Sequence, residues 1–560
     1  MLTSDLVVHD VHRWLLSQGF VHVTEETRCY AYDGSIQCNH VEVPIRLSFL
    51  DLVFQELPDI HLREPRPEKL CHPLPHVDHQ GKLCYLDMES YRLDPYQPTK
   101  TIVTLLEQAR RVLIGSLSGA NSDDVGYEFR LYWDASDCGV VLSNHQSGHS
   151  IKYNRLEYQS PTGTTHKQLV VGTDEEIEAY RKWRNGKLMV LENRSALWIN
   201  INTTALLPEK GPWPPQNFRA FHEWLKSVSP AADQSLQKGL GTKVGAQSPL
   251  LVVLNTRGGF VSIEAVLPES LSTLTRHPSR FRKQLLMDKG RFGTKFIRGF
   301  LDDFSPKFLT TRNLPGSGLS GKRIVVVGLG TIGGYLSRLL VQSGAGQGSG
   351  QLILYDEQIL STGNIGRHYL DGSYLYENKA EACRHKLSEE YPTAQILARK
   401  KHFEHINDMR QVDFIIDATG REPFSLSLNS QAIQRHHANL PCPPILYIWI
   451  DGNGYCGRTL YYDGSGGCYR CLQDLSGKDR FEPLKSMKDL VPMSNQCSES
   501  YIPYPPSASV QTAGMGLEAV LDWVNGSPGA FFRSRRFHKK ARKHKDHRLT
   551  PQEGCPACQS

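Results

Sequence analysis

The sequence predicts a multidomain α/β protein with an α+β N-terminal region, a mixed middle region and a C-terminal domain built on a doubly wound parallel sheet. Three observations lead to this prediction. The chain has 560 residues, which is too many for a single hydrophobic core. Its composition separates three regions, for which we expect the bounds 1–140, 141–315 and 316–560. In the last region, buried strands alternate with helices, a pattern typical of a parallel sheet covered on both faces.

The bulk composition indicates an ordinary soluble globular protein, with 39% hydrophobic and 22% charged residues. The formal net charge of +6 is small for this length and does not by itself point to nucleic acid. The stretch "MLTSDLVVHDVHRWLLSQGF" carries acids early and is amphipathic, which predicts a helix and not a signal peptide. No apolar run approaches the roughly eighteen residues that span a bilayer. We therefore expect a cytoplasmic protein without a membrane partner.

The N-terminal region places a cysteine, Cys84, in "HPLPHVDHQGKLCYLD". The strand-like "VEVPIRLSFL" precedes it, and "TKTIVTLLEQARRVLIGSL", with apolar residues at helical spacing, follows it. Cys84 comes just after a Pro/His/Gly-rich turn and lies between apolar residues. A buried structural thiol and a nucleophile held on a loop both explain this placement, and the local sequence leaves the choice open.

The middle region mixes strand-like runs, such as "ALWININ" and "PLLVVLN", with polar loops. One of these loops is the long polar stretch "SPAADQSLQKGLGTKVGAQSP". No motif in the region indicates a chemical role, so the sequence assigns it no function.

The C-terminal region opens with "VVVGLGTIGG", which places Gly328, Gly330 and Gly333 in a G-x-G-x-x-G arrangement between a strand and a helix. Such glycines allow a tight turn and let backbone N–H groups approach a phosphate at the positive end of the helix. Asp356, at the end of the next strand, is placed to accept hydrogen bonds from ribose hydroxyls. Alone, this pattern fits an NAD-dependent dehydrogenase about as well as an ATP site.

The residues that follow favour ATP. Asn364 and Arg367 occur in "DEQILSTGNIGRHYL", and Lys379 occurs in "YENKAEACRHKL". Hydride transfer needs no cations here, whereas an enzyme that adenylates a carboxylate must neutralise a triphosphate and the departing pyrophosphate. Asp417, in "IIDATG", ends a further strand and could hold magnesium against the phosphates. Each residue alone is better explained as a solvated surface group, and it is their joint order that points to adenylation.

This order of residues resembles the ubiquitin-activating superfamily, which includes the bacterial sulfur-carrier adenylyltransferases. The resemblance implies ATP and Mg²⁺ as cofactors. It implies nucleotide contacts for Gly328, Gly330, Gly333 and Asp356, and contacts to phosphates and metal for Asn364, Arg367, Lys379 and Asp417. Bacterial members usually carry a second acid three residues after the first at this strand end. Gly420 stands there in this chain, so the magnesium role rests on Asp417 alone.

Two C-x-x-C pairs occur in the same region. They are Cys468 and Cys471 in "GGCYRCL", and Cys555 and Cys558 in "GCPACQS". One pair alone could be a redox centre, but two pairs supply the four thiolates of a tetrahedral zinc site. The activating family resembles this chain here too, and the resemblance implies a structural Zn²⁺ that ties the C-terminal tail to the domain.

Cys497 lies in "PMSNQCSESYIPYPPSASV", and its spacing pairs it with no other cysteine. The segment resembles the crossover segment of the activating family, whose cysteine receives the acyl group from the adenylate. A thiolate is a good acceptor for an activated carboxylate, and the product is a thioester. The alternative is a buried free cysteine.

The segment around Cys84 resembles the active-site loop of ubiquitin-conjugating enzymes. Pro75, Gly81 and Cys84 keep that family's spacing of proline, glycine and nucleophile, and "YQPTKTIVTLLEQA" matches its proline-led helix. His76 stands where the family has an asparagine that steadies the oxyanion, and Leu74 replaces its usual histidine. The resemblance implies that Cys84 carries a thioester and that His76 donates a hydrogen bond in the asparagine's place.

A conjugating-type domain followed by an activating-type domain resembles the fused ligase of bacterial cyclic-oligonucleotide antiphage (CBASS) operons. The resemblance implies that a protein C-terminus is adenylated, passed to Cys497, then to Cys84, and finally to a target lysine. It also implies a homodimer, and a cGAS/DncV-like nucleotidyltransferase as the activated protein.

Three alternatives remain open from the sequence. The same chemistry could act on a ubiquitin-like protein of another bacterial conjugation operon. The chain could be a sulfur-carrier adenylyltransferase in which Cys84 is dispensable. It could also be a non-catalytic scaffold whose basic run, residues 531–548, binds nucleic acid. Such a run is more often a solvated face or a docking loop, so nucleic acid is not the expected partner.

Overall fold

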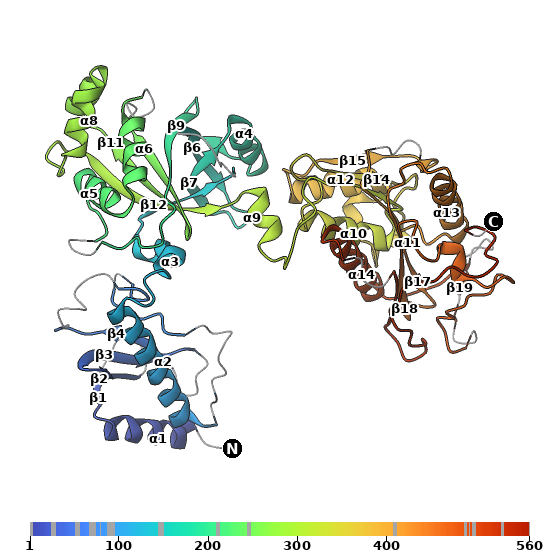
Figure 1. The fold of residues 1–560 in the computed structure, drawn as a ribbon, viewed down its shortest axis with the longest axis horizontal. Helices are drawn as coiled ribbons and strands as arrows, with labels where there is room; N and C mark the ends of the chain where they lie inside the picture. The colour runs from blue at the N-terminus through green and yellow to red at the C-terminus, as the bar shows by residue number, and fades with distance from the viewer. Residues whose placement is uncertain are drawn as a thin grey trace. The chain divides into compact units, whose positions relative to one another are not determined.

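The computed structural model describes residues 4–23, 30–50, 56–65, 74–78, 80–86, 94, 96–143, 150–208, 213–242, 248–406, 411–486, 490–491, 493–494, 500–527 and 531–558. The chain divides into two compact units, and Figure 1 shows their ribbons with many of the elements labelled. The first unit comprises Met1–Arg181 and Asn185–Asp303, and the second comprises Lys182–Arg184 and Phe304–Ser560.

The N-terminal part of the first unit is an α+β fold. Its elements are α1 (Ser4–Ser17), β1 (Val21–Val23), β2 (Tyr30–Cys38), β3 (Val41–Phe49), β4 (Asp59–Leu62), α2 (Pro98–Ser118) and α3 (Val125–Tyr132). The strands pair antiparallel in the order β1-β2-β3-β4. Alternate residues of β3, among them Val43, Ile45 and Leu47, are buried on the face that α2 covers. Helix α2 buries a stripe at helical spacing that includes Ile102 and Leu105, which confirms the predicted helix.

The rest of the first unit is a mixed sheet with helices packed on it. Its elements are β5 (Asp137–Val141), β6 (Ser150–Gln159), β7 (Thr165–Gly172), α4 (Asp174–Trp183), β8 (Lys187–Leu188), β9 (Arg194–Asn200), α5 (Phe218–Val228), α6 (Pro230–Leu240), β10 (Leu250–Thr256), β11 (Gly259–Val266), α7 (Glu269–Ser272), η2 (Thr273–Arg276), α8 (Pro278–Leu286) and β12 (Lys295–Asp303). The strand order is β7-β5-β12-β11-β10-β9-β6-β8, and β7 also pairs with β6, so the pairings close into a ring. Phe129 of α3 packs against Trp133, Trp213 and Trp224, which anchors α3 to this part.

The second unit is built on a sheet in the order β15-β14-β13-β16-β17-β18-β21. Its elements are α9 (Pro306–Thr311), β13 (Arg323–Val327), α10 (Thr331–Gln342), β14 (Gln351–Tyr355), α11 (Thr362–Ile365), η3 (Gly372–Tyr374), α12 (Lys379–Glu390), β15 (Ile396–Arg399), β16 (Phe414–Asp417), α13 (Glu422–His437), β17 (Ile445–Asp451), β18 (Cys456–Tyr462), η5 (Tyr469–Leu472), β19 (Met493–Ser494), β20 (Ser500–Tyr501), α14 (Pro506–Val524) and β21 (Phe532–Arg536). Strands β13 to β17 run parallel, and β18 and β21 add antiparallel strands at one edge.

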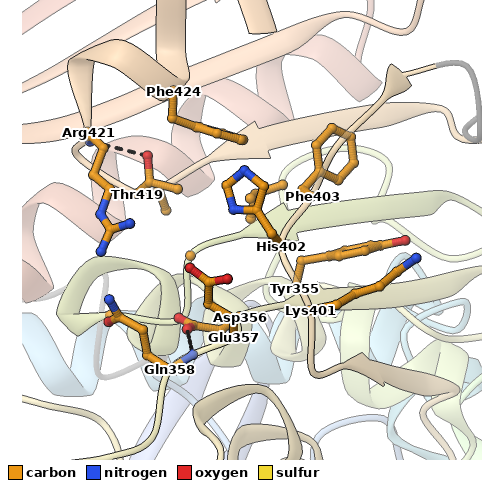
Figure 2. A pocket seen from close by; sticks show the side chains of 14 residues that line it. Tyr355, Asp356, Glu357, Gln358, Lys401, His402, Phe403, Thr419, Arg421 and Phe424 are labelled. Carbon is orange, nitrogen blue, oxygen red and sulfur yellow. Dashed lines mark hydrogen bonds between the residues drawn. The ribbon is translucent and has the colours of Figure 1, made fainter. Parts of the chain in front are cut away.

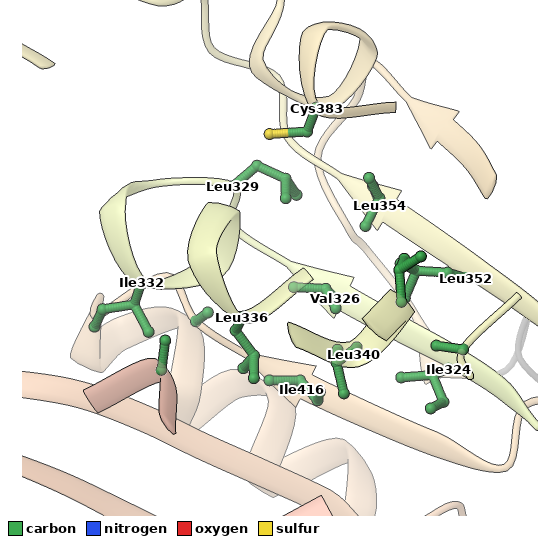
Figure 3. Close-up of a cluster of buried hydrophobic side chains, with 14 of the residues drawn as sticks. Ile324, Val326, Leu329, Ile332, Leu336, Leu340, Leu352, Leu354, Cys383 and Ile416 are labelled. Carbon is green, nitrogen blue, oxygen red and sulfur yellow. The ribbon is translucent and has the colours of Figure 1, made fainter. Parts of the chain in front are cut away.

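Both faces of this sheet are covered. Along β13, Ile324 and Val326 belong to one core, while Val325 and Val327 belong to the core on the opposite face. Leu336 of α10 lies in the first of these cores, which Figure 3 shows in close-up. Side chains alternate between the two faces of a strand, and both faces are buried here. The strand is therefore a continuous apolar run in the sequence.

The predicted fold class is confirmed, with an α+β N-terminal part and a doubly wound C-terminal sheet. The antiparallel strands β18 and β21 were not read from the sequence pattern. Over the residues that the structure describes, no helix is both long and apolar enough to cross a membrane.

Candidate active site

The glycine turn lies between β13 and α10 at the carboxyl edge of the parallel sheet. Gly328 adopts a φ of +87°, which an L side chain rarely tolerates. A Cβ atom at Gly333 would lie 1.9 Å from the carbonyl oxygen of Gly328, so this glycine lets the helix pack against the turn. A Cβ atom at Gly330 would meet nothing within 4 Å. The backbone at Gly330 is therefore open to a ligand at the N-terminus of α10.

Asp356 ties the second strand to this turn. Its Oδ2 accepts a hydrogen bond from the backbone N–H of Leu329 at 2.7 Å, and its Oδ1 accepts one from the N–H of Gln358 at 2.8 Å. The Gln358 side chain in turn accepts a hydrogen bond from Nζ of Lys379 at 2.9 Å. Burial lowers the pKa of Lys379, and the charge of Asp356 opposes this shift. The structure thus brings Asp356 and Lys379 together beside the glycine turn, and their contacts to a nucleotide stay a prediction.

A pocket opens where β13, β14 and β16 end. Its lining residues are Val327, Gly328, Gly330, Tyr355, Asp356, Glu357, Gln358, Lys401, His402, Phe403, Ala418, Thr419, Arg421 and Phe424. In Figure 2, Arg421 and Gln358 lie on one side of the pocket, with Asp356 and His402 near its centre. The sequence reasoning missed Arg421 and His402, because they follow β16 and β15 and reach the pocket only when the strands align.

Arg367 and Asn364 lie on the segment after β14. The Arg367 guanidinium stacks 4.5 Å from the ring centre of Tyr504, and its buried Nε has no hydrogen-bond partner among the described residues. The Tyr504 hydroxyl is 2.9 Å from Oγ1 of Thr331, the first residue of α10. Arg367 therefore offers an unsatisfied donor close to the helix N-terminus. Asn364 is the third residue of α11 and completes a capping box with the N-cap residue Ser361, whose N–H and hydroxyl donate to its side-chain oxygen.

Asp417 is buried at the end of β16, with 1% of its surface exposed. Its Oδ1 accepts hydrogen bonds from the backbone and hydroxyl of Thr419, and its Oδ2 accepts one from the hydroxyl of Ser425. Burial raises its pKa. It is not among the residues that line the pocket. In this conformation Asp417 holds the turn that follows β16, and its magnesium role stays a prediction.

A second, polar pocket borders the same turn. Its lining residues are Gly420, Glu422, Ser425, Ile448, Trp449, Ile450, Asp451, Arg458, Tyr469, Leu472, Gln473, Gly477 and Asp479. Arg458 is 4% exposed and forms ion pairs with both Asp451 and Asp479. Asp451, at the end of "ILYIWID", is the sequence feature that indicates this pocket, since ligands bind beyond the carboxyl ends of parallel strands. The sequence reasoning missed this acid.

The four cysteines of the C-x-x-C pairs come together. Sγ of Cys468 lies 3.7 Å from Sγ of Cys471 and 4.0 Å from Sγ of Cys555, and Sγ of Cys471 lies 3.5 Å from Sγ of Cys558. All four sulfur atoms lie within 4.8 Å of one another. Tetrahedral zinc with bonds of about 2.3 Å would separate its sulfur ligands by about 3.8 Å, so the cluster fits Zn²⁺.

Cys497 lies outside the described residues. The strands on either side of it, β19 and β20, pair antiparallel. Tyr504, which stacks on Arg367, comes seven residues after Cys497 in the sequence and just before α14.

Cys84 is exposed on a loop that backbone hydrogen bonds hold against β4. The N–H of Leu83 donates to the carbonyl of Ile60 at 2.7 Å, and the N–H of Leu62 donates to the carbonyl of Gly81 at 2.8 Å. The N–H of Cys84 donates to the carbonyl of His76 at 2.7 Å. The thiol borders a pocket lined by Leu57, Pro58, Asp59, His76, Asp78, Lys82, Leu83, Tyr85, Leu86, Glu128, Leu131 and Tyr132. An exposed thiol on a fixed loop is chemically suited to acyl transfer.

His76 stands beside this thiol with both ring nitrogens facing carboxylates. Nε2 lies 3.1 Å from Oδ2 of Asp124, and Nδ1 lies 3.2 Å from Oε2 of Glu128. The contact with Cys84, followed by that with Glu128, raises the pKa of His76 to about 10. The pair with His76 lowers the pKa of Glu128. The sequence reasoning missed both acids, because nothing in the chain order announces that α3 meets the Cys84 loop.

Three arginines of the basic run are paired with acids of the same domain. Arg533 pairs with Asp522, Arg535 pairs with Asp546 at 2.6 Å, and Arg542 lies 3.3 Å from a carboxylate oxygen of Glu482. Part of the run forms strand β21. These contacts give the run a structural explanation.

The fold and the two sites define a class: an adenylation-type domain with a glycine-turn pocket joined to an α+β domain with an exposed cysteine. The model of the ThiF family matches residues 316–540, and that of the prokaryotic E2 family B matches residues 19–138. An ATP-dependent ubiquitin transferase-like protein Cap2 of Pseudomonas aeruginosa is 31% identical over 85% of this chain and 84% of its own length. Proteins of the same description from Escherichia coli and Vibrio cholerae are 28% and 27% identical over 90% and 80% of this chain, and over 89% and 80% of their own lengths.

The chain belongs to the family of ATP-dependent ubiquitin transferase-like proteins called Cap2. It is therefore an enzyme with an activating-type and a conjugating-type domain in one chain, and the predicted family is confirmed.

Proposed function

We propose that this enzyme adenylates the C-terminus of a protein, carries it as a thioester first on Cys497 and then on Cys84, and conjugates it to a lysine. One observation carries the proposal. The same chain holds an open glycine-turn pocket with a carboxylate and cations around it, and an exposed cysteine fixed on a loop beside a histidine that faces two carboxylates. A sulfur-carrier adenylyltransferase or a scaffold needs only the first of these, or neither.

The residues around the first pocket fit ATP. Gly330 leaves space for a phosphate, and Asp356 can accept a hydrogen bond from a ribose hydroxyl. The buried Nε–H of Arg367 has no hydrogen-bond partner among the described residues. Lys379 and Arg421 add positive charge near Asp356. When bound, the nucleotide supplies the leaving group for acyl transfer. Magnesium is proposed to accompany it, but Asp417 is 1% exposed and does not line this pocket in the described conformation, so this carboxylate fits poorly as a ligand.

The second pocket is the proposed site of the substrate tail. It borders the first across the turn at residues 419–425, and Arg458 places a buried cation in it. There a carboxylate oxygen would attack the α-phosphorus, and pyrophosphate would leave. The cations of the first pocket would stabilise the charge that develops on the leaving group.

Two transfers to cysteines and one to an amine would complete the reaction. The thiolate of Cys497 attacks the acyl carbon and AMP leaves. The thiolate of Cys84 attacks the new thioester and releases Cys497. A lysine amine then attacks, forms an amide bond and releases Cys84. Joining both carriers in one chain raises their effective concentration, and a homodimer would permit transfer within or between subunits.

The proposed activated protein is a cGAS/DncV-like nucleotidyltransferase of an antiphage operon in the cytoplasm. A ubiquitin-like protein of another operon would use the same residues. Only an experiment that shows which of the two proteins forms an adduct distinguishes these substrates. The proposed Zn²⁺ would hold the C-terminal tail through Cys555 and Cys558 and take no part in the chemistry.

The test incubates the chain with magnesium–ATP and a candidate partner that has an intact C-terminus. Non-reducing gels and intact mass then report thiol-sensitive adducts in wild type, Cys497→Ala and Cys84→Ala. We expect two adduct sites in wild type, none at Cys84 in Cys497→Ala, and an adduct that stays on Cys497 in Cys84→Ala. An adduct on Cys84 that forms equally well without Cys497 would contradict the relay. A lasting absence of adducts from a chain that still binds ATP would favour the sulfur-carrier or scaffold alternative.

A further inference from the structure

Two carboxylates approach His76 from different directions, one from Asp124 at the N-cap of α3 and one from Glu128 within α3. Oδ2 of Asp124 lies 3.1 Å from Nε2, and Oε2 of Glu128 lies 3.2 Å from Nδ1. A neutral imidazole has one N–H and one lone pair, and only the doubly protonated ring donates from both nitrogens. Both carboxylates are therefore satisfied only when His76 is a cation. Exchanging the two ring orientations does not change this conclusion, because a carboxylate faces each nitrogen.

Tyr132 fixes the arrangement from the same helix. Its hydroxyl accepts a hydrogen bond from the backbone N–H of His76 at 2.6 Å and donates one to Oε2 of Glu128 at 3.2 Å. His76 has a φ of +61°, a conformation that this contact helps to hold. The ring lines the same pocket as Cys84, whose backbone N–H donates to the carbonyl of His76 at 2.7 Å. Backbone and ring of His76 are thus both fixed next to the nucleophile.

We propose that Asp124 and Glu128 are positioning residues that hold His76 as an imidazolium ion against Cys84. The ring then places a positive charge beside the sulfur, which stabilises the thiolate before transfer and the oxyanion during transfer. The inference rests on the proposed role of Cys84 as an acyl carrier. It goes beyond that role because it assigns the activation of the thiol to two acids outside the Cys84 loop, at the N-cap and in the first turn of α3.

The other charged side chains that line this pocket are engaged elsewhere and do not pair with His76. The titratable groups lining the pocket or touching His76 are Asp59, Asp78, Lys82, Tyr85, Asp124, Glu128 and Tyr132. Lys82 is paired with Asp59 at 2.6 Å, and Asp78 accepts hydrogen bonds from backbone N–H groups of its own turn. Loss of Asp124 and Glu128 would remove both carboxylate contacts of the ring and lower the pKa of His76 toward its ordinary value near 6.5, while the contact with Cys84 remains.

The experiment measures the rate at which iodoacetamide alkylates Cys84 in the full chain, by peptide mass spectrometry, between pH 6 and pH 9. It needs neither nucleotide nor partner. In the double variant Asp124→Asn/Glu128→Gln, we expect the rate at pH 8 to fall about tenfold, which corresponds to about 1.4 kcal/mol. At pH 6 the ring is charged in both proteins, so the loss should disappear. In a His76→Asn background the same double substitution should lower the rate at neither pH.

The matched control is Asp123→Asn. This substitution removes a charge one residue away from Asp124, and the new amide can still accept the hydrogen bond from Thr204. Its rate should equal that of wild type at every pH. Glu128→Gln alone, at a side chain that is 28% exposed, should move the rate in the same direction with little risk to folding.

A double variant that alkylates faster than wild type at pH 8, with or without His76, would overturn the proposal. The carboxylates would then act on the thiolate directly as like charges. Equal rates at pH 8 would also overturn it. The expected alkylation profile, found in a chain that forms no thioester on Cys84, would uphold this inference and refute the proposed relay, so the two failures are distinguishable.

Discussion

One added methyl group should weaken ATP binding at Gly330 and lower the stability of the domain at Gly333. A Cβ atom at Gly330 would extend into open space in the candidate nucleotide pocket, at a φ of −71° that alanine adopts readily. A Cβ atom at Gly333 would lie 1.9 Å from the carbonyl oxygen of Gly328, more than 1 Å closer than such contacts allow. Gly330→Ala should therefore keep the fold and fill the place of a phosphate. Gly333→Ala should force the helix away from the turn.

The expected magnitudes differ accordingly. Gly330→Ala should change the free energy of unfolding by less than about 0.5 kcal/mol, as is usual where no buried contact changes. It should weaken ATP binding at least about tenfold, or about 1.4 kcal/mol. Gly333→Ala should destabilise the domain by about 1–3 kcal/mol or more, as overpacked sites do. Gly372→Ala, at an exposed glycine whose Cβ would also meet nothing within 4 Å, is the matched control for both effects.

Isothermal titration with ATP and thermal unfolding in its absence separate the two quantities. ATP binding by Gly330→Ala with wild-type affinity would refute the assignment of this turn to the phosphates. Wild-type stability of Gly333→Ala would refute the packing argument.

Three further outcomes follow from the same structure. Chelation or Cys555→Ser should lower the unfolding temperature, and metal analysis should show the loss of one zinc per chain. The substitution removes one of four clustered thiolates. A wild-type chain purified without metal would contradict this. Arg458→Met should destabilise the domain by about 3–5 kcal/mol in chemical denaturation, since it leaves Asp451 and Asp479 without their cation; a loss within about 0.5 kcal/mol would show that these acids need no partner. Burial lowers the pKa of His368 to about 4, so the unfolded chain binds the proton more tightly and stability is lost as the pH falls below about 6.5. This loss should reach about 2 kcal/mol at pH 5 and be absent in His368→Gln, and equal pH dependence of the two proteins would contradict it.

The sequence predicts those parts of the site whose residues are close in the chain or end successive strands. The glycine turn and Asp356 follow from one strand–turn–helix unit, because strand ends of a parallel sheet meet at one edge. The cysteine pairs are recognisable because each brings half of a tetrahedral ligand set. Lys379 is close to Asp356 because it begins the helix that follows the same loop.

The parts that the sequence does not predict depend on tertiary contacts. Asp124 and Glu128 reach His76 only because α3 is anchored through Phe129 to the tryptophans of the middle region. In the sequence Arg421 cannot be told from a solvated surface cation, and only the fold places it beside the pocket. The arginines of the basic run read as a charged patch, although acids distant in the sequence, such as Glu482 for Arg542, pair with several of them.

The most direct test of the central claim is a rapid-quench time course on the wild-type chain with magnesium–ATP and the partner that forms adducts. Peptide mass spectrometry would follow the thioesters on Cys497 and Cys84 separately. The account predicts that the Cys497 adduct rises first and decays as the Cys84 adduct grows, and that Cys84→Ala leaves the first adduct undiminished. A Cys84 adduct that appears without a lag, and at the same rate in Cys497→Ala, would contradict the relay.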